Sequence, residues 1–222
     1  MNTSSSAHSR ARPLVIVALA LLASAGAVRA DPPPDRTVSY RIERNGDRIG
    51  THRVVFARAG ERLTVHHRID IRVTVLRFEA YAYQMDSRET WEGDRLLGLT
   101  TSTDRNGDAL RVFARASGER LRIRAPEGAR EAPAHAVPSS PQHWVFDRPR
   151  TVMFEAEDGR LLSVRVSAPE TESLELGGER VACRRVTVAG DLDATLWYAP
   201  SGILVRKRLT APDGSTVLSR LE

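Results

Sequence analysis

The chain contains one cysteine, and this scarcity excludes a fold held together by disulfides. The single thiol, Cys183, cannot form an internal bridge, so the fold must depend on a hydrophobic core. Cys183 also lies far from the N-terminus, which excludes the acylated N-terminal cysteine of a lipoprotein. We expect a buried, inert thiol in a strand, with an intermolecular disulfide or a redox role as the alternative.

Lysine is equally scarce, because Lys207 is the only one in the chain. The remaining positive charge is carried by arginines scattered along the sequence, and the longest basic run covers only residues 206–208. A nucleic-acid-binding protein concentrates such charge in a patch or a long run, so we expect no nucleic-acid partner. Glycine-rich phosphate-binding loops are also absent from the sequence, and we expect no cofactor.

Long hydrophobic runs are missing beyond residues 14–23, which are too few for the roughly 20 residues that cross a bilayer. Arg10 and Arg12 precede this run, and Val28-Arg29-Ala30 has the small-residue pattern of a signal-peptidase site. We therefore predict a signal peptide over residues 1–30 and one β-rich domain over residues 31–222, exported to the periplasm without a membrane span. A retained N-terminal anchor is the alternative.

Alternation of polar and apolar residues is the dominant pattern, and it is clearest over residues 62–76. Successive side chains of a strand point to opposite faces, so this pattern predicts a strand with one dry face. His67 is the exception on that face. The dry face otherwise consists of Leu63, Val65, Ile69, Ile71, Val73 and Val75.

Turn sequences rich in glycine, asparagine and aspartate separate further alternating segments, and no helical period is evident. A strand as long as 62–76 must bend, since most strands have only five or six residues. We therefore predict an all-β fold, a single curved antiparallel meander resembling a half-barrel. The predicted strands are 37–44, 48–58, 62–76, 78–91, 95–104, 109–116, 120–125, 151–157, 160–167, 172–176, 180–189, 194–198, 203–210 and 215–221.

The first hairpins allow a prediction of register. If Gly60 and Glu61 form a two-residue loop, His52 lies opposite Ile69 and apolar positions meet apolar positions. The same register places His52 and His67 on one face as diagonal neighbours, roughly 7 Å apart.

Residues 126–150 contain five prolines, which oppose a regular strand ladder. No strand is predicted there. Ser140 and Pro141 could instead cap one short helix through residues 142–144. We interpret this segment as a crossover over one end of the sheet, either a lid on a cavity or a simple connection.

Four segments together resemble an exported bacterial family known as a domain of unknown function. They are residues 49–52, 89–96, 101–107 and 197–202. Members of that family are similar to the lipoprotein-localisation-factor type of fold, a strongly curved antiparallel sheet covered by short helices. The resemblance implies a periplasmic protein with a concave apolar surface, and it implies no catalytic residue. Ala199 occupies a position where other members tend to have aspartate.

Enzymatic chemistry has weaker support. Adjacent strand residues face opposite sides, so His66 and His67 cannot share a metal ion. His52 and His67 could do so, but only with a third ligand, and their neighbours on that face are apolar. A buried, hydrogen-bonded histidine is the simpler interpretation, and we predict no metal site.

Hydrolytic and acid–base chemistry also lack a clear motif. The sequence contains no Gly-x-Ser-x-Gly turn. Ser139 and Ser140 lie near His143, but a helix cap is the better explanation of these serines. Asp86, Glu89 and Asp104 could converge as paired carboxylates, but their spacing does not select them.

Tyr81, Tyr83 and Trp91 share one face of the strand 78–91, and the opposite face is also partly apolar. Core packing explains one of these faces, and the other needs a cover, which is the crossover segment, a partner or a bound apolar molecule. We predict a non-enzymatic protein that holds an apolar ligand, such as a lipid or acyl chain, in the concave face of the sheet. The alternative is an envelope protein that docks a partner through a sheet edge or aromatic face. A hydrolase or metal enzyme, whose activity or metal would be lost on His67→Ala, is the third possibility. The predicted ligand-binding residues are His52, Phe56, Val65, His67, Ile69, Tyr81, Tyr83 and Trp91.

Overall fold

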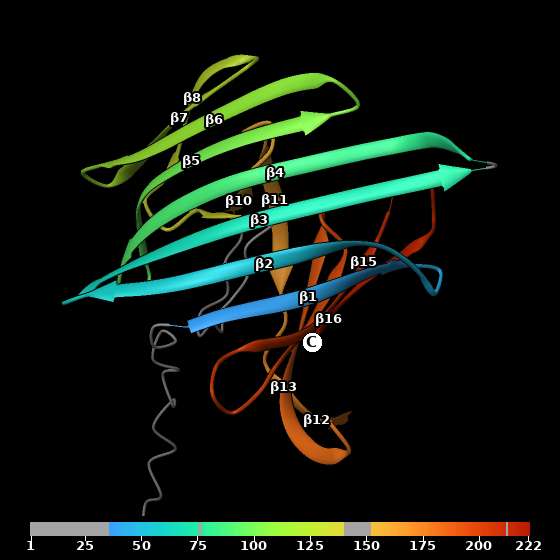
Figure 1. The fold of residues 1–222 in the computed structure, drawn as a ribbon. Coiled ribbons are helices and arrows are strands. Elements are labelled where there is room, and N and C mark those ends of the chain that lie inside the picture. Colours follow the sequence, from blue (N-terminus) through green and yellow to red (C-terminus); the bar gives the residue numbers. More distant parts are fainter. Residues whose placement is uncertain (1–35, 76, 140–151, 212) are drawn as a thin grey trace, which may run out of the picture.

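The computed structural model describes residues 36–75, 77–139, 152–211 and 213–222, and within these ranges the protein consists of strands without a helix. The first half of the chain is a continuous antiparallel meander (Figure 1). Its strands are β1 (Arg36–Arg44), β2 (Asp47–Ala59), β3 (Arg62–Val75), β4 (Phe78–Glu92), β5 (Arg95–Arg105), β6 (Asp108–Ser117), β7 (Arg120–Ala125) and β8 (Gly128–Pro133).

The second half supplies eight strands that continue the same sheet, and all of them except β13 have seven residues or fewer. They are β9 (Val137–Pro138), β10 (Val152–Phe154), β11 (Leu161–Val166), β12 (Glu170–Leu176), β13 (Glu179–Gly190), β14 (Ala194–Tyr198), β15 (Leu204–Thr210) and β16 (Thr216–Leu221).

The two halves meet where β1 pairs with β16, so the sheet runs from β8 through β1 and β16 to β9. β12 stands outside this order and pairs with β13. The sheet is open and strongly curved, and the C-terminal strands pass behind the N-terminal meander at a steep angle (Figure 1). The prediction of an all-β fold with one curved sheet is confirmed.

The predicted register between β2 and β3 is also confirmed. Ala59 lies opposite Arg62, and His52 lies opposite Ile69. Gly60 in the connecting turn has a φ of 61°, a left-handed conformation that costs glycine little. Apolar side chains of β2 and β3 consequently share the concave face of the sheet.

The core fills the space between the two halves. The turn between β10 and β11 packs under β7, where a Cβ on Gly159 would lie 2.7 Å from the Cβ of Ala125 and 3.1 Å from Cγ2 of Ile123. Leu121 and Phe154, from β7 and β10, are both fully buried in one cluster. The sheet thus folds over so that its C-terminal end covers part of its own concave face.

The crossover segment differs from the prediction, because residues 128–133 and 137–138 form strands β8 and β9. Pro133 is the last residue of β8 and Pro138 is the last residue of β9. Both strands are edges of the sheet, where the missing N–H of a proline is tolerated. β9 pairs parallel to β10, so the meander is not wholly antiparallel. The helix predicted over residues 142–144 lies outside the described residues.

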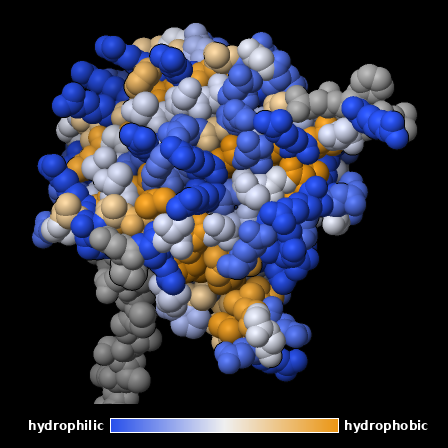
Figure 2. Space-filling model, viewed as in Figure 1, coloured by the Kyte–Doolittle hydropathy of each residue, from blue (hydrophilic) through white to orange (hydrophobic). Residues whose placement is uncertain are grey.

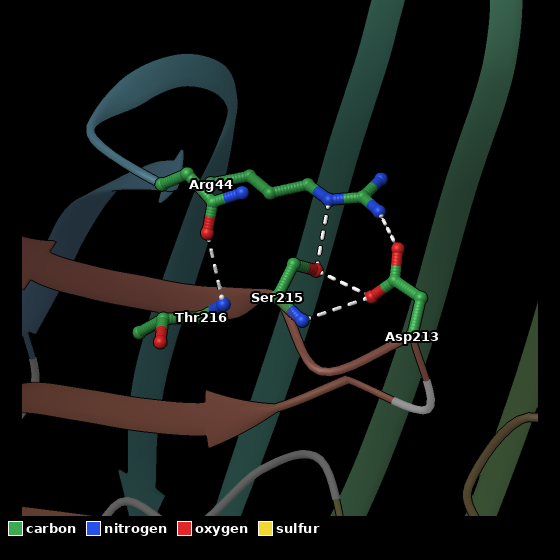
Figure 3. A network of polar contacts seen from close by, with 5 residues as sticks. Arg44, Asp213, Ser215 and Thr216 are labelled. Atoms are coloured by element: carbon green, nitrogen blue, oxygen red, sulfur yellow. Dashed lines mark hydrogen bonds and ion pairs between the residues drawn. The ribbon is translucent and has the colours of Figure 1, made fainter.

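A polar network joins the end of β1 to the turn between β15 and β16 (Figure 3). The Arg44 guanidinium binds the Asp213 carboxylate and donates to Ser215 Oγ at 3.0 Å. Ser215 Oγ donates to Asp213 Oδ1 at 2.6 Å, and the backbone N–H of Ser215 reaches the same oxygen at 3.1 Å. These contacts fix the ends of the two hairpins that meet where the halves pair.

Gly50 lies so close to β3 that a side chain would disturb the pairing. A Cβ at this position would be 2.2 Å from the backbone oxygen of Asp70. We expect Gly50→Ala to lower the free energy of unfolding by about 2 kcal/mol, as overpacking does elsewhere. Urea unfolding followed by circular dichroism measures this loss.

Gly98→Ala is the matched control in β5, because its Cβ would meet only the Ala114 backbone oxygen at 3.6 Å. This variant should unfold at the urea concentration of the parent protein or above it. Equal losses from the two substitutions would contradict the assigned approach of β2 to β3.

Residues 1–35 are not among those described, so the signal peptide remains a prediction. A search of the described ranges for a helix with the length and apolar character needed to cross a bilayer found none.

Candidate functional site

A cavity of about 220 Å³ lies between the concave face of β1–β4 and the strands β15 and β16. Its surface is largely apolar, and residues next to the crossover close one side. The lining residues are Tyr40, Ile42, His52, Ile69, Ile71, Tyr83, Ser139, Glu155, Leu192, Leu204, Lys207, Leu209, Val217 and Ser219.

Polar groups line one part of this cavity. Ser139 is buried and its hydroxyl donates to Glu155 Oε1 at 2.6 Å. Lys207 also faces the cavity, and burial lowers the pKa of its ammonium to about 8, partly offset by the negative charge of Glu155. The cavity therefore combines an apolar wall with one titratable cation and one carboxylate.

A line of buried polar side chains, here called the buried polar array, runs from the cavity into the core. His52 Nε2 lies 3.3 Å from His67 Nδ1, and His67 Nε2 lies 3.7 Å from Glu89 Oε1. The indole N–H of Trp91 donates to Glu89 Oε2 at 2.7 Å. At the cavity end, the His52 ring stacks on Tyr40 with centroids 5.4 Å apart.

The residues of this array all lie on strands β1 to β4, and the register of these strands brings them together. Tyr40 lies directly opposite His52, and Val54 lies opposite His67 one strand further on. Val65 lies opposite Glu89, so His67 is diagonal to both His52 and Glu89 across the concave face. The array is therefore held by a rigid ladder of backbone hydrogen bonds.

Burial determines the protonation state of the array. It lowers the pKa of both His52 and His67 well below the ordinary value, and nearby positive charges, Lys207 among them, lower it further. Burial raises the pKa of Glu89 to about 8, although the Trp91 hydrogen bond opposes the rise. At pH 7 the histidines are neutral and Glu89 is mostly protonated, so the contact between His67 and Glu89 joins neutral groups rather than an ion pair.

The array does not assemble a set of metal ligands. Two facing imidazole nitrogens can bind one ion, but a stable site needs a third protein ligand or more. The described residues contain no group of three or more histidine, cysteine, aspartate or glutamate side chains arranged to hold a metal. Nδ1 of His67 faces His52, whereas Nε2 of the same ring faces Glu89. Glu89 therefore could not coordinate an ion bound between the two rings.

The convergence considered for Asp86, Glu89 and Asp104 does not occur. Glu89 is fully buried on the concave face, whereas Asp86 and Asp104 line a hollow of about 430 Å³ on the outer face. Even and odd positions of one strand face opposite sides, which separates Asp86 from Glu89. In that outer hollow, Asp86 accepts hydrogen bonds from His66 at 2.8 Å and Arg68 at 3.1 Å, as expected of a solvated surface.

Of the predicted ligand-binding residues, His52, Ile69 and Tyr83 line the cavity. Tyr81 is half-buried and stacks on Tyr83 with centroids 6.4 Å apart, but it does not line the cavity. Four others lie in the closed core, namely Phe56, Val65, His67 and Trp91.

Sequence reasoning missed the contributions of Tyr40, Glu155 and Lys207 to the cavity. Tyr40 continues the alternation of β1, which is a signal visible in the sequence. Lys207 is the only lysine and lies on a strand, but its approach to His52 depends on the pairing of β1 with β16, which no local pattern indicates.

The described fold and cavity define the class: an all-β protein whose single curved sheet encloses a small, largely apolar cavity. The chain belongs to the family described as Domain of unknown function (DUF6134), whose model matches residues 40–222. A comparison with curated proteins found no match.

Proposed function

We propose that this protein is an exported, non-enzymatic binding protein that holds an apolar ligand in the cavity between the two halves of its sheet. The observation that carries this proposal is the cavity of about 220 Å³ with a largely apolar surface. An apolar pocket with a few convergent polar groups is the usual form of a small-molecule site.

The volume limits the size of the ligand. Pockets for drug-sized molecules measure about 300–1,000 Å³, so this cavity fits a short acyl chain or a comparably small apolar molecule better than a whole phospholipid. Lys207 and Glu155 at its wall suit a ligand with one polar end that hydrogen-bonds to them. We also propose a relationship to the lipoprotein-localisation-factor type of fold, which the curved sheet around an apolar cavity supports, whereas the short helices expected to cover that sheet are absent from the described residues.

Native mass spectrometry of the protein purified from the periplasm tests the proposal directly. We expect an added mass that organic solvent releases and that chromatography of the extract identifies as apolar. Protein that is repeatedly empty, from cells grown under several conditions, would contradict it.

A cavity-filling variant sharpens this test. Ile71 lines the cavity, so Ile71→Trp should fill much of its volume and reduce ligand occupancy at least tenfold. Thr100→Trp places the same side chain on the exposed face of β5 and should keep the occupancy of the parent protein. If both variants retain the ligand equally, the ligand lies elsewhere.

A further inference from the structure

The outer face of β6 and β7 carries an exposed aromatic side chain among arginines. Phe113 is 47% exposed, and within the described residues only Leu161 is another large hydrophobic side chain with comparable exposure. Phe113 lies opposite Arg124 on β7, and Arg111 and Arg115 flank it on β6. All three arginines are exposed.

Register places like charges directly against each other on this face. Arg115 lies opposite Arg122 across β6 and β7, an arrangement that destabilises a sheet when nothing neutralises it. Arg122 has a partial partner in Glu131 of β8, at 3.3 Å, but Glu131 also binds Arg120 at 3.3 Å. The Glu131 carboxylate is therefore shared between Arg120 and Arg122.

The remaining arginines of this face are unpaired. Within the part of the chain that the structure describes, Arg111, Arg115 and Arg124 make no ion pair. We define the arginine–phenylalanine patch as Arg111, Phe113, Arg115, Arg122 and Arg124. In Figure 2, the region over β6–β8 at the upper left shows mostly hydrophilic side chains with isolated hydrophobic ones between them.

We propose that the arginine–phenylalanine patch binds the anionic surface of a lipid bilayer. Guanidinium groups bind phosphate oxygens in a bidentate manner, and each basic side chain near an anionic leaflet adds to affinity. Helices that lie in the bilayer interface likewise combine basic side chains with aromatic ones. A polyanionic surface would also neutralise the opposed Arg115 and Arg122.

A bilayer fits this patch better than another polyanion does. Proteins that bind single-stranded nucleic acid present several aromatic side chains on which successive bases stack, whereas this patch has one. Its β-strand surface is broad and presents four arginines around that single ring. The proposal goes beyond ligand binding and does not depend on the cavity, which lies on the opposite face of the sheet.

Sedimentation with vesicles tests the proposal. The purified protein should bind vesicles of phosphatidylcholine containing phosphatidylglycerol and should not bind vesicles of phosphatidylcholine alone. Binding should weaken steeply as salt is raised, because salt screens exposed charges. The triple variant Arg111→Gln, Arg115→Gln and Arg124→Gln should bind about fivefold more weakly for each arginine, roughly a hundredfold in all.

The control variant removes three exposed arginines elsewhere, at Arg62, Arg165 and Arg180, and gives the same net charge. It should bind the anionic vesicles within about threefold of the parent protein, a reduction that reflects net charge alone. Phe113→Ser should weaken binding while leaving its salt dependence unchanged. Ile71→Trp should bind vesicles normally, which separates this proposal from that of the cavity.

Three outcomes would overturn the proposal. They are absence of binding to anionic vesicles at low salt, equal losses in the patch and control variants, and binding to nucleic acid in place of vesicles. Circular dichroism of each variant establishes that it is folded before it is compared.

Discussion

Replacing Glu89 by glutamine is expected to stabilise the protein in alkaline solution, by roughly 5 kcal/mol at pH 9. Glu89 is fully buried in β4, and burial raises its pKa from 4.5 to about 8. In the unfolded chain the same carboxyl ionises near its ordinary pKa. Glutamine has nearly the same shape and cannot ionise, so the variant avoids the cost of a charge in the core.

The sign of the pH dependence follows from proton binding. Between pH 4.5 and about 8 the folded protein keeps the proton on Glu89 while the unfolded chain has lost it. The free energy of unfolding therefore falls by about 1.4 kcal/mol per pH unit in this interval. His52 and His67 act in the opposite direction below pH 6.5, because their lowered pKa values leave the unfolded chain with more protons.

The stability lost through Glu89 and the stability gained through the two histidines balance near pH 6.5, the ordinary pKa of histidine. The parent protein should therefore be most stable near this pH. Urea unfolding at a series of pH values should show a decline from pH 6.5 to pH 8 in the parent protein and little decline in Glu89→Gln. Lys207, whose pKa is lowered to about 8, changes the free energy of unfolding mainly above pH 8 and does so in both proteins, so their difference reports Glu89.

Glu92→Gln is the control, because Glu92 is exposed at the end of the same strand. It should follow the pH profile of the parent protein. A Glu89→Gln variant that still loses stability between pH 6.5 and pH 8 would show that another group carries the dependence.

Trp91→Ala is expected to destabilise the protein by about 3 to 5 kcal/mol, the usual loss for an aromatic residue removed from a core. Trp91 is only 2% exposed and packs in the main hydrophobic cluster. Its indole N–H also donates to Glu89 Oε2 at 2.7 Å. Alanine would remove both the packing and the one hydrogen bond that lowers the pKa of Glu89.

Trp91→Phe separates these two effects. It keeps most of the buried ring and loses the donor, so it should cost about 1 to 3 kcal/mol through the unsatisfied carboxyl. The pKa of Glu89 should rise further in this variant, which moves the end of the alkaline decline to higher pH. Thermal unfolding at pH 6.5 and pH 8.5 measures both quantities.

The double variant Trp91→Phe, Glu89→Gln completes the test. The glutamine amide oxygen also accepts from the indole N–H, so the cost of Trp91→Phe should be larger with glutamate than with glutamine at pH 8.5, where much of Glu89 is ionised. Equal costs with glutamate and with glutamine at both pH values would contradict the assigned hydrogen bond, and a loss below about 1 kcal/mol for Trp91→Ala would contradict its burial.

Strand positions could be predicted from the sequence because one face of each long strand is buried, and burial imposes a period of two. The register of β2 and β3 followed from Gly60 and from the match of apolar positions, and it brought His52 and His67 together. Such information is local, since it depends on one turn and its two neighbouring strands.

The two short strands of the crossover could not be predicted in this way. Prolines normally oppose strands, and Pro133 and Pro138 are tolerated because β8 and β9 form the outer edges of the sheet. Position within a sheet is a property of the whole fold.

The cavity was only partly predictable for the same reason. His52, Ile69 and Tyr83 share a face of adjacent strands, so alternation indicated them. Lys207 and Glu155 reach the cavity from strands that are distant in sequence. The position of Glu89 could have been inferred, because its odd number places it on the same face of β4 as Met85 and Trp91.

The pairing of β1 with β16 has a consequence for how the chain acquires its structure. Arg220 and Glu43 bond across this pair although 177 positions separate them. Closing so large a loop is entropically costly, and proteins dominated by such distant contacts fold slowly. Until residues 216–221 arrive, the edge of β1 stays open to strands of other molecules, so a nascent or truncated chain needs protection from aggregation.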